Sequence, residues 1–222
     1  MKAFRADLHI HSCLSPCADL DMSPKAIVEK SLEEGLDIVA LCDHNSAENV
    51  GAAIRVATKR GITVIPGMEI NTKEEVHILA LFEGEAQALD MQRTVYSHLQ
   101  GTNRPELFGD QVVANELDEV EGFNDRLLIG ATGLTLQEVI GEIHNLGGLC
   151  IASHIDRPSY SLLSQLGFVP PDIKLNGVEI SRPMQREEID IGKAFTSFFI
   201  EAPNLKELGL ALEGKDDRKV LG

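Results

Sequence analysis

Histidines recur in this 222-residue chain at the places where predicted β-strands end. The four that lie at or just past a strand's carboxyl end are His9, His11, His44 and His154. His9 and His11 are two residues apart, so on an extended strand both side chains point to one face and can hold one metal ion together. Imidazole combined with carboxylate suits Zn²⁺, Mn²⁺ or Fe²⁺. The spacing therefore predicts a divalent metal site.

Two further residues extend this pattern towards hydrolysis. Glu69, in Gly67-Met68-Glu69, is a carboxylate that can bridge two ions, and His77 enters an apolar strand. Paired ions about 3.5 to 4 Å apart clamp a phosphoryl group and generate hydroxide from bound water at neutral pH. We therefore expect metal-assisted hydrolysis of a phosphate ester.

The elements that must position these residues follow an α/β pattern, because apolar runs alternate with amphipathic segments. The expected strands are 3–10, 36–42, 62–66, 76–82, 149–153, 177–181 and 196–201. The expected helices are 24–35, 47–60, 85–99, 135–147 and 205–212. Ser23-Pro24 marks one helix start, and Thr135 with Glu138 makes a capping box at another. This rhythm predicts βα units around a parallel sheet.

One acidic stretch interrupts the rhythm. Residues 101–133 have no helical periodicity and carry seven acids: Glu106, Asp110, Glu116, Asp118, Glu119, Glu121 and Asp125. Long loops are uncommon unless they are functional. We interpret the stretch as an insertion or lid, and the alternative is a solvated surface excursion without a role in chemistry.

Composition limits the class of protein and its partners. With 43% hydrophobic residues, residues 1–222 can form one domain with a large core. The formal charge of −15 disfavours duplex nucleic acid, so we expect no duplex partner, although bound cations still allow a small phosphorylated substrate. No stretch approaches the ~20 apolar residues that a membrane helix needs. The four cysteines follow no export signal, so we expect a soluble protein of the reducing cytoplasm.

Five motifs together resemble those of the PHP (polymerase and histidinol phosphatase) domain family. They are Asp7-Leu8-His9-Ile10-His11-Ser12, Asp43-His44-Asn45, Gly67-Met68-Glu69, His77-Ile78-Leu79 and Ala152-Ser153-His154. The resemblance implies a distorted (β/α)₇ TIM-like barrel with a dinuclear or trinuclear metal centre. It also implies a hydrolase of phosphomonoesters or small phosphodiesters that uses a metal-activated hydroxide.

The same resemblance implies roles for individual residues. The metal ligands would be His9, His11, His44, Glu69, His77 and His154, together with an acid after the first motif. Counting back from Ser23-Pro24 points to Asp19 as this acid, with Cys17 as its rival. Asp43 and Asp7 would orient histidine rings. The guanidinium of Arg157 would bind the phosphate through two parallel hydrogen bonds.

The chain departs from the family pattern near its carboxyl end. PHP domains normally close with an Asp-x-His motif, and none follows His154. We expect an internal deletion and a shortened C-terminal part, for which Glu179 and Asp190 are substitutes that are not predicted to sit correctly. The alternative function is a catalytically impaired PHP protein that binds metal or a phosphorylated ligand. An amidohydrolase is less favoured because no bridging lysine is found, and a nuclease is less favoured because of the charge.

Overall fold

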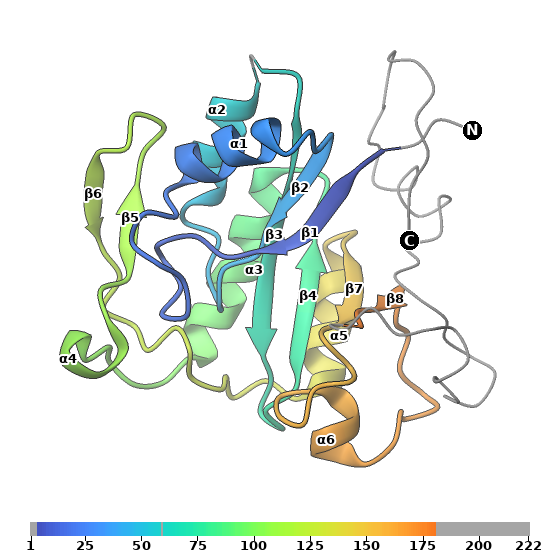
Figure 1. Ribbon diagram of the computed structural model, residues 1–222. Helices are drawn as coiled ribbons and strands as arrows, with labels where there is room; N and C mark the ends of the chain where they lie inside the picture. The colour runs from blue at the N-terminus through green and yellow to red at the C-terminus, as the bar shows by residue number, and fades with distance from the viewer. Residues whose placement is uncertain (1–3, 59, 181–222) are drawn as a thin grey trace.

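Six strands form one curled sheet in the computed structural model, which describes residues 4–58 and 60–180. The sheet order is β1-β2-β3-β4-β7-β8 (Figure 1). Their bounds are β1 Ala6–Ile10, β2 Ile38–Leu41, β3 Thr63–Asn71, β4 His77–Leu81, β7 Leu149–Ala152 and β8 Gly177–Val178. β4 is antiparallel to β3 and β7, and the other neighbouring strands are parallel.

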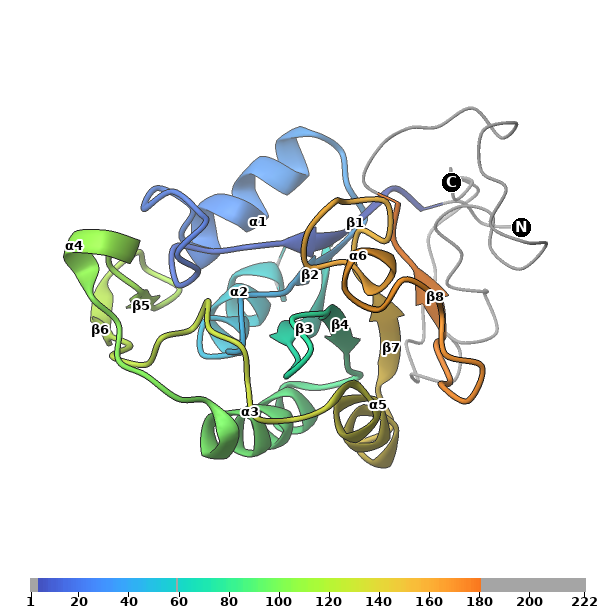
Figure 2. The same cartoon turned by 90° about the horizontal axis from the view of Figure 1, so that it is seen from below.

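Four helices cover the convex face of the sheet, as the view from below shows (Figure 2). They are α1 (Pro24–Glu33), α2 (Val50–Ala57), α3 (Glu85–His98) and α5 (Leu136–Asn145). α6 (Leu162–Leu166) follows β7. Ser23 caps α1, and the predicted capping box of Thr135 and Glu138 is present at α5. These caps satisfy amide groups that would otherwise lack partners at the helix starts.

The concave side of the sheet has its own apolar core. It consists of Ile38, Ala40, Cys42, Ile65, Leu79, Leu81, Leu149 and Ile151. Gly67 lies among these residues. A larger residue would not fit there, because a Cβ would come within 2.6 Å of the Cys42 sulfur. Since side chains alternate along a strand, Glu69 faces the same concave side as Ile65 and Gly67. The sheet thus carries Glu69 towards its interior.

The direction of β4 differs from the prediction of a parallel sheet. Residues 72–76 form a tight turn, in which the amide of Thr72 donates to the carbonyl of Val76 over 3.0 Å, so β3 and β4 are a hairpin. This reversal places His77, at the start of β4, at the edge where β1, β2, β3 and β7 end. A closed barrel of seven units stays a prediction, because the expected elements 196–201 and 205–212 lie outside the described residues.

The acidic stretch 101–133 contains α4 (Pro105–Phe108) and a hairpin of β5 (Val112–Ala114) and β6 (Val120–Phe123). It supports the loops that follow β1 and β2. The Val112 amide donates to the Cys13 carbonyl over 3.0 Å, and the Asn45 side chain donates to the Leu128 carbonyl over 2.7 Å. In residues 4–58 and 60–180, no helix is both long and apolar enough to cross a bilayer.

Candidate metal centre

A pocket of about 340 Å³ lies at the edge where these strands end. Its lining comes from residues far apart in the sequence, namely His9, His11, Cys17, His44, Glu69, His77, His154, Arg157, Ser159, Tyr160 and Glu179. None of residues 101–133 contributes to it. The acidic stretch therefore does not cover the pocket in this structure.

Backbone pairing beyond the regular strands brings these side chains together. His44 forms a parallel bridge with Glu69, in which the Asn45 amide donates to the Glu69 carbonyl over 2.9 Å. The Glu179 amide donates to the Ala152 carbonyl over 2.8 Å, which places Glu179 beside His154. His154 has a φ of 28°, a left-handed conformation that costs on the order of 1 to 3 kcal/mol in a residue of this kind.

Glu69 is the centre of the cluster. Its Oε1 lies 3.3 Å from Nε2 of His9, 3.1 Å from Nδ1 of His77 and 3.2 Å from Nε2 of His154. Its Oε2 lies 3.3 Å from Nε2 of His11 and 3.2 Å from Nδ1 of His44. One buried carboxylate therefore faces five imidazoles, and its two oxygens divide them into two groups.

The orientation of the His11 ring is set by Ser15 and Asp43. The Ser15 hydroxyl donates to the buried Asp43 carboxylate over 2.7 Å, and its oxygen accepts the His44 amide over 3.0 Å. Nδ1 of His11 lies 3.0 Å from the same oxygen. Because the hydroxyl hydrogen is already used, this Nδ1 must be the donor, which leaves Nε2 of His11 facing Glu69.

His9 is oriented in the same way by Glu179. Nδ1 of His9 donates to Glu179 over 2.8 Å, so its Nε2 also faces the interior of the cluster. The two Nε2 atoms of His9 and His11 are 3.0 Å apart. At this distance two ring nitrogens cannot both direct lone pairs at each other, so at least one of them must carry a proton or bind a cation.

Electrostatic effects in the cluster follow from burial beside Glu69. Burial alone would raise the pKa of Glu69, but hydrogen bonds from His11, His154, His77 and His9 hold it well below its usual range. Burial also opposes protonation of His9 and His11, yet the pKa of His9 is raised to about 9, through Glu179 and Glu69. The pKa of His11 is raised to about 10, through Cys17 and Glu69. Burial lowers the pKa of His44 to about 3.

The donor set fits divalent metal ions. Buried Nδ1 atoms of His44 and His154 have no hydrogen-bond partner. The cluster also combines five imidazoles, which bind metal ions in their neutral form, with one anionic carboxylate. These are ligands that Zn²⁺, Mn²⁺ and Fe²⁺ accept. A metal ion beside Glu69 would satisfy Nδ1 of His44, which lies 3.2 Å from Oε2 of Glu69 and has no hydrogen-bond partner.

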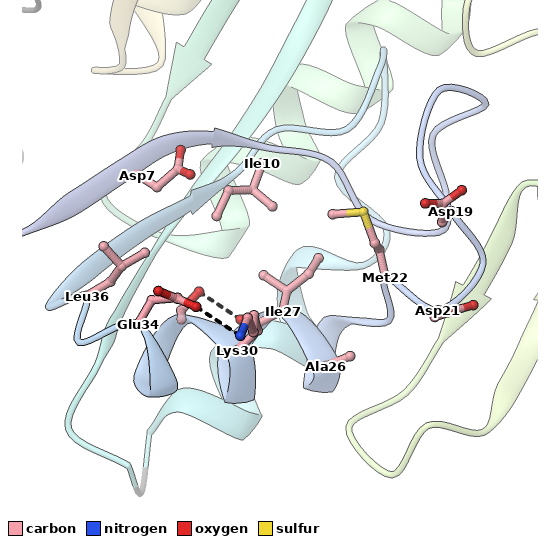
Figure 3. Close-up of a pocket in the computed structure, with 11 residues that line it drawn as sticks. Asp7, Ile10, Asp19, Asp21, Met22, Ala26, Ile27, Lys30, Glu34 and Leu36 are labelled. Atoms are coloured by element: carbon pink, nitrogen blue, oxygen red, sulfur yellow. Dashed lines mark hydrogen bonds and ion pairs between the residues drawn. The ribbon is translucent and has the colours of Figure 1, made fainter.

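Six of the seven predicted metal ligands are brought together, and Asp19 is not. Asp19 lines a different pocket between β1 and α1, together with Asp7 and Lys30 (Figure 3). The turn that follows β1 explains the difference, since the Ala18 amide donates to the Ser15 carbonyl and the Met22 amide donates to the Asp19 carbonyl, each over 3.0 Å. The turn presents Cys17 to the histidines instead.

Other predicted residues differ in how they act. Asp43 was expected to hold a ring directly, but it binds Ser12 and Ser15 and reaches His11 only through Ser15. Asp7 likewise accepts the backbone amide of His9 over 3.2 Å, not a ring nitrogen. Arg157 is exposed and lines the pocket, and its role in phosphate binding stays a prediction.

Sequence reasoning missed two residues that orient ligands of this site. Glu179 was not expected to sit correctly, and it lies against His9 and His154. The signal for it was its place within the predicted strand 177–181, and in the structure it directly follows β8. Ser15 carried no signal of its own, because its role depends on Asp43 and His11 meeting in space. Asp190 lies outside the described residues.

Sequence comparisons match this chain to one family model and to two relatives, over stretches of different length. The family model described as PHP domain matches residues 7–165. An uncharacterized protein of Methanocaldococcus jannaschii is 25% identical over 207 residues, which cover 90% of this chain and 94% of that protein. A 5'-3' exoribonuclease of Haemophilus influenzae is 37% identical over 78 residues, which cover 34% of this chain and 27% of that enzyme.

Solved structures share the fold. The lesion-specific endonuclease Q of Pyrococcus furiosus has a TM-score of 0.58 at 21% identity, over 80% of this chain and 42% of that one. A candidate metal-dependent phosphoesterase from Bifidobacterium adolescentis has a TM-score of 0.55 at 17% identity, over 80% and 77% of the two chains. The chain thus spans less than half of endonuclease Q and of the exoribonuclease.

The prediction that duplex nucleic acid is excluded is wrong. A further structure of endonuclease Q, with a TM-score of 0.56 at 21% identity over 80% of this chain and 42% of that one, contains a 27-mer duplex substrate with an abasic lesion at its active site. The exclusion rested on the net charge of −15. A net charge does not decide the partner, because bound cations can reverse the potential close to a site while the rest of a surface stays acidic.

Proposed function

The chain belongs to the PHP domain family, and on that premise we propose that it is a metal-dependent hydrolase of phosphate esters. The observation that carries the proposal is the Glu69 carboxylate, buried to 2% exposure and faced by five imidazoles. Bound divalent ions supply a nucleophile from water at neutral pH and a clamp for phosphoryl oxygens. The protein's part is to hold and orient the ligands for those ions.

The proposed centre has two metal positions. Oε1 of Glu69 would serve one position with His9, His77 and His154, and Oε2 would serve the other with His11 and His44. A carboxylate that meets separate sets of nitrogens with its two oxygens is suited to bridge two ions. Ser15 and Glu179 would keep the ring nitrogens of His11 and His9 directed inwards.

The rim of the pocket supports a phosphorylated substrate. Arg157 is exposed there, and a guanidinium can form two parallel hydrogen bonds with a phosphate. Tyr160 lies beside it, and its ring stacks on His77 with the centroids 4.8 Å apart. A volume of about 340 Å³ suits a phosphoryl group with a small substituent, either as a monoester or as a small diester. Because relatives include nucleases, oligonucleotides belong among the substrates to be tested.

Elemental analysis and hydrolysis assays test the proposal together. We expect at least one divalent ion per chain in protein purified without chelators, and its loss in a His9→Ala/His154→Ala double variant. Manganese- or zinc-loaded protein should hydrolyse 4-nitrophenyl phosphate, bis(4-nitrophenyl) phosphate, a nucleoside monophosphate or a short oligonucleotide. His98→Ala is the matched control, because His98 is exposed on α3.

The outcomes separate the competing functions. Hydrolysis that disappears in the double variant and persists in His98→Ala supports the enzyme. Bound metal without hydrolysis of any of these substrates supports the catalytically impaired binding protein. A wild-type chain that binds no divalent ion refutes both.

A further inference from the structure

The loop after β1 directs a cysteine, not an acid, into the metal centre. The Cys17 sulfur and one ring nitrogen each from His11 and His44 all lie within 4.8 Å of one another. Cys17 lines the histidine pocket and is exposed, whereas Cys13, Cys42 and Cys150 are buried. Its sulfur is therefore the only thiol of the four that both faces the cluster and is open to solvent.

A second observation at the same place indicates a missing ligand partner. Nδ1 of His44 is buried and has no hydrogen-bond partner, although it lies 3.2 Å from Oε2 of Glu69. The side chain of His44 is 7% exposed. A buried ring nitrogen of this kind loses hydration without replacing it, unless a proton or a cation binds there. His44 is also a member of the group that contains Cys17.

We infer that Cys17 supplies a thiolate ligand to the metal position formed by His11, His44 and Oε2 of Glu69. This inference rests on the proposed function, since it concerns one of the two proposed metal positions. One thiolate, two imidazoles and one carboxylate oxygen give four donors, the number that Zn²⁺ takes in protein sites.

The local backbone gives the reason why Cys17 takes this place. Ser15 is fixed by its bonds with Asp43 and the His44 amide. The turn from Ser15 to Ala18 then carries residue 17 back towards the histidines, and the following turn directs Asp19 to the other side of β1. Asp19 lines that other pocket, so it does not serve this metal position in the structure.

The thiolate makes the two metal positions chemically different. Sulfur is a soft ligand that favours Zn²⁺ and Co²⁺ over Mn²⁺ and Mg²⁺, whereas the position with His9, His77 and His154 offers only nitrogen and oxygen. The centre should therefore hold zinc or cobalt at the Cys17 position even when the other position contains manganese.

Cobalt spectroscopy tests the ligand directly. Metal-free protein in a non-thiol reductant is titrated with Co²⁺, and a sulfur-to-cobalt charge-transfer band is expected in the near ultraviolet beside the visible d–d bands. Cys17→Ser should lose the charge-transfer band, and Cys17→Asp should lose it while still binding cobalt through a carboxylate. Asp19→Asn is the matched control and should retain the band.

Alkylation gives a readout that does not depend on cobalt. Under native conditions iodoacetamide should modify the metal-free chain at Cys17 alone, since the other three cysteines are buried, and zinc should block this modification. Circular dichroism of Cys17→Ser checks that the variant is folded.

Each result decides the matter. Loss of the band in both Cys17 variants, its retention in Asp19→Asn and protection by zinc establish the ligand. Visible cobalt bands without a charge-transfer band, or a band that survives Cys17→Ser, overturn the inference and leave the proposed function intact. A wild-type chain that binds no cobalt or zinc overturns both.

Discussion

Replacement of Ser15 by alanine is the sharpest test of how the cluster is held. The Ser15 hydroxyl is 1% exposed and makes three contacts, with Asp43 at 2.7 Å, the His44 amide at 3.0 Å and Nδ1 of His11 at 3.0 Å. Ser15→Ala removes one oxygen atom and all three contacts. It changes little volume, so packing effects stay small beside the loss of hydrogen bonds.

The expected cost in stability follows from those contacts. A hydrogen bond to a charged carboxylate contributes about 1.5 to 3 kcal/mol, and a buried amide without a partner costs about 1 to 3 kcal/mol. Asp43 keeps its two bonds with the Ser12 amide and hydroxyl, each 2.6 Å long, so its charge is not left unpaired. We therefore expect a loss of about 3 kcal/mol in the free energy of unfolding, near the lower end of the combined range.

Metal affinity should fall as well, because His11 loses the acceptor that fixes its ring. Loss of such an orienting partner typically weakens metal binding about 10- to 100-fold. Urea denaturation followed by circular dichroism measures the stability, and competition with a chromophoric chelator measures zinc affinity. Ser97→Ala, at an exposed serine of α3, should change stability by less than about 0.5 kcal/mol. If Ser15→Ala matches Ser97→Ala in stability and zinc affinity, the relay from Asp43 through Ser15 to His11 has no role.

Three further predictions concern protonation, substrate binding and a helix cap. The pKa values of His9 and His11 are raised to about 9 and about 10 in the folded chain. Their stabilisation is therefore complete below the unfolded pKa of about 6.5 and is lost as the pH rises through those values. The Tm of metal-free protein should fall between pH 6.5 and 10 more than that of zinc-loaded protein, and equal slopes would contradict this. Arg157→Ala should raise KM for a phosphorylated substrate about 10- to 100-fold, the equivalent of one charged hydrogen bond, with Tm unchanged; an unchanged KM would remove Arg157 from substrate binding. Thr135→Ala breaks the capping box of α5 and should cost about 1 kcal/mol in urea denaturation, whereas a change below the error of that measurement would show the cap to be dispensable.

Local sequence patterns were sufficient to predict most elements. The strand at 36–42 and the helix at 85–99 were placed within about two residues of β2 and α3. Hydrophobic periodicity and capping residues act over a few positions, so they can be read without knowledge of the fold. The predicted strand 62–66 is shorter than β3, because Gly67 interrupts the apolar run in the sequence. Only the close packing of Cys42 against Gly67 explains why glycine belongs in that strand.

The direction of β4 and the contacts within the metal centre could not be predicted in the same way. An apolar strand such as His77–Leu81 has the same pattern whether it runs parallel or antiparallel to its neighbour. Its reversal is what brings His77 to the edge occupied by His154 and Glu69. The partners of those residues are set by contacts between segments far apart in the chain.

The sequence by itself determined the chemistry of the site, because imidazole and carboxylate at strand ends are recognisable from residue type and spacing alone. Only the tertiary structure decided which residues complete the site. Asp19 and Cys17 are two positions apart, and the sequence favoured Asp19 with Cys17 as its rival, yet the turns after β1 send them into different pockets. Glu179 reaches His9 across 170 positions of sequence. Local periodicity carries no information about such contacts, since they depend on how the curled sheet brings β1, β7 and β8 together.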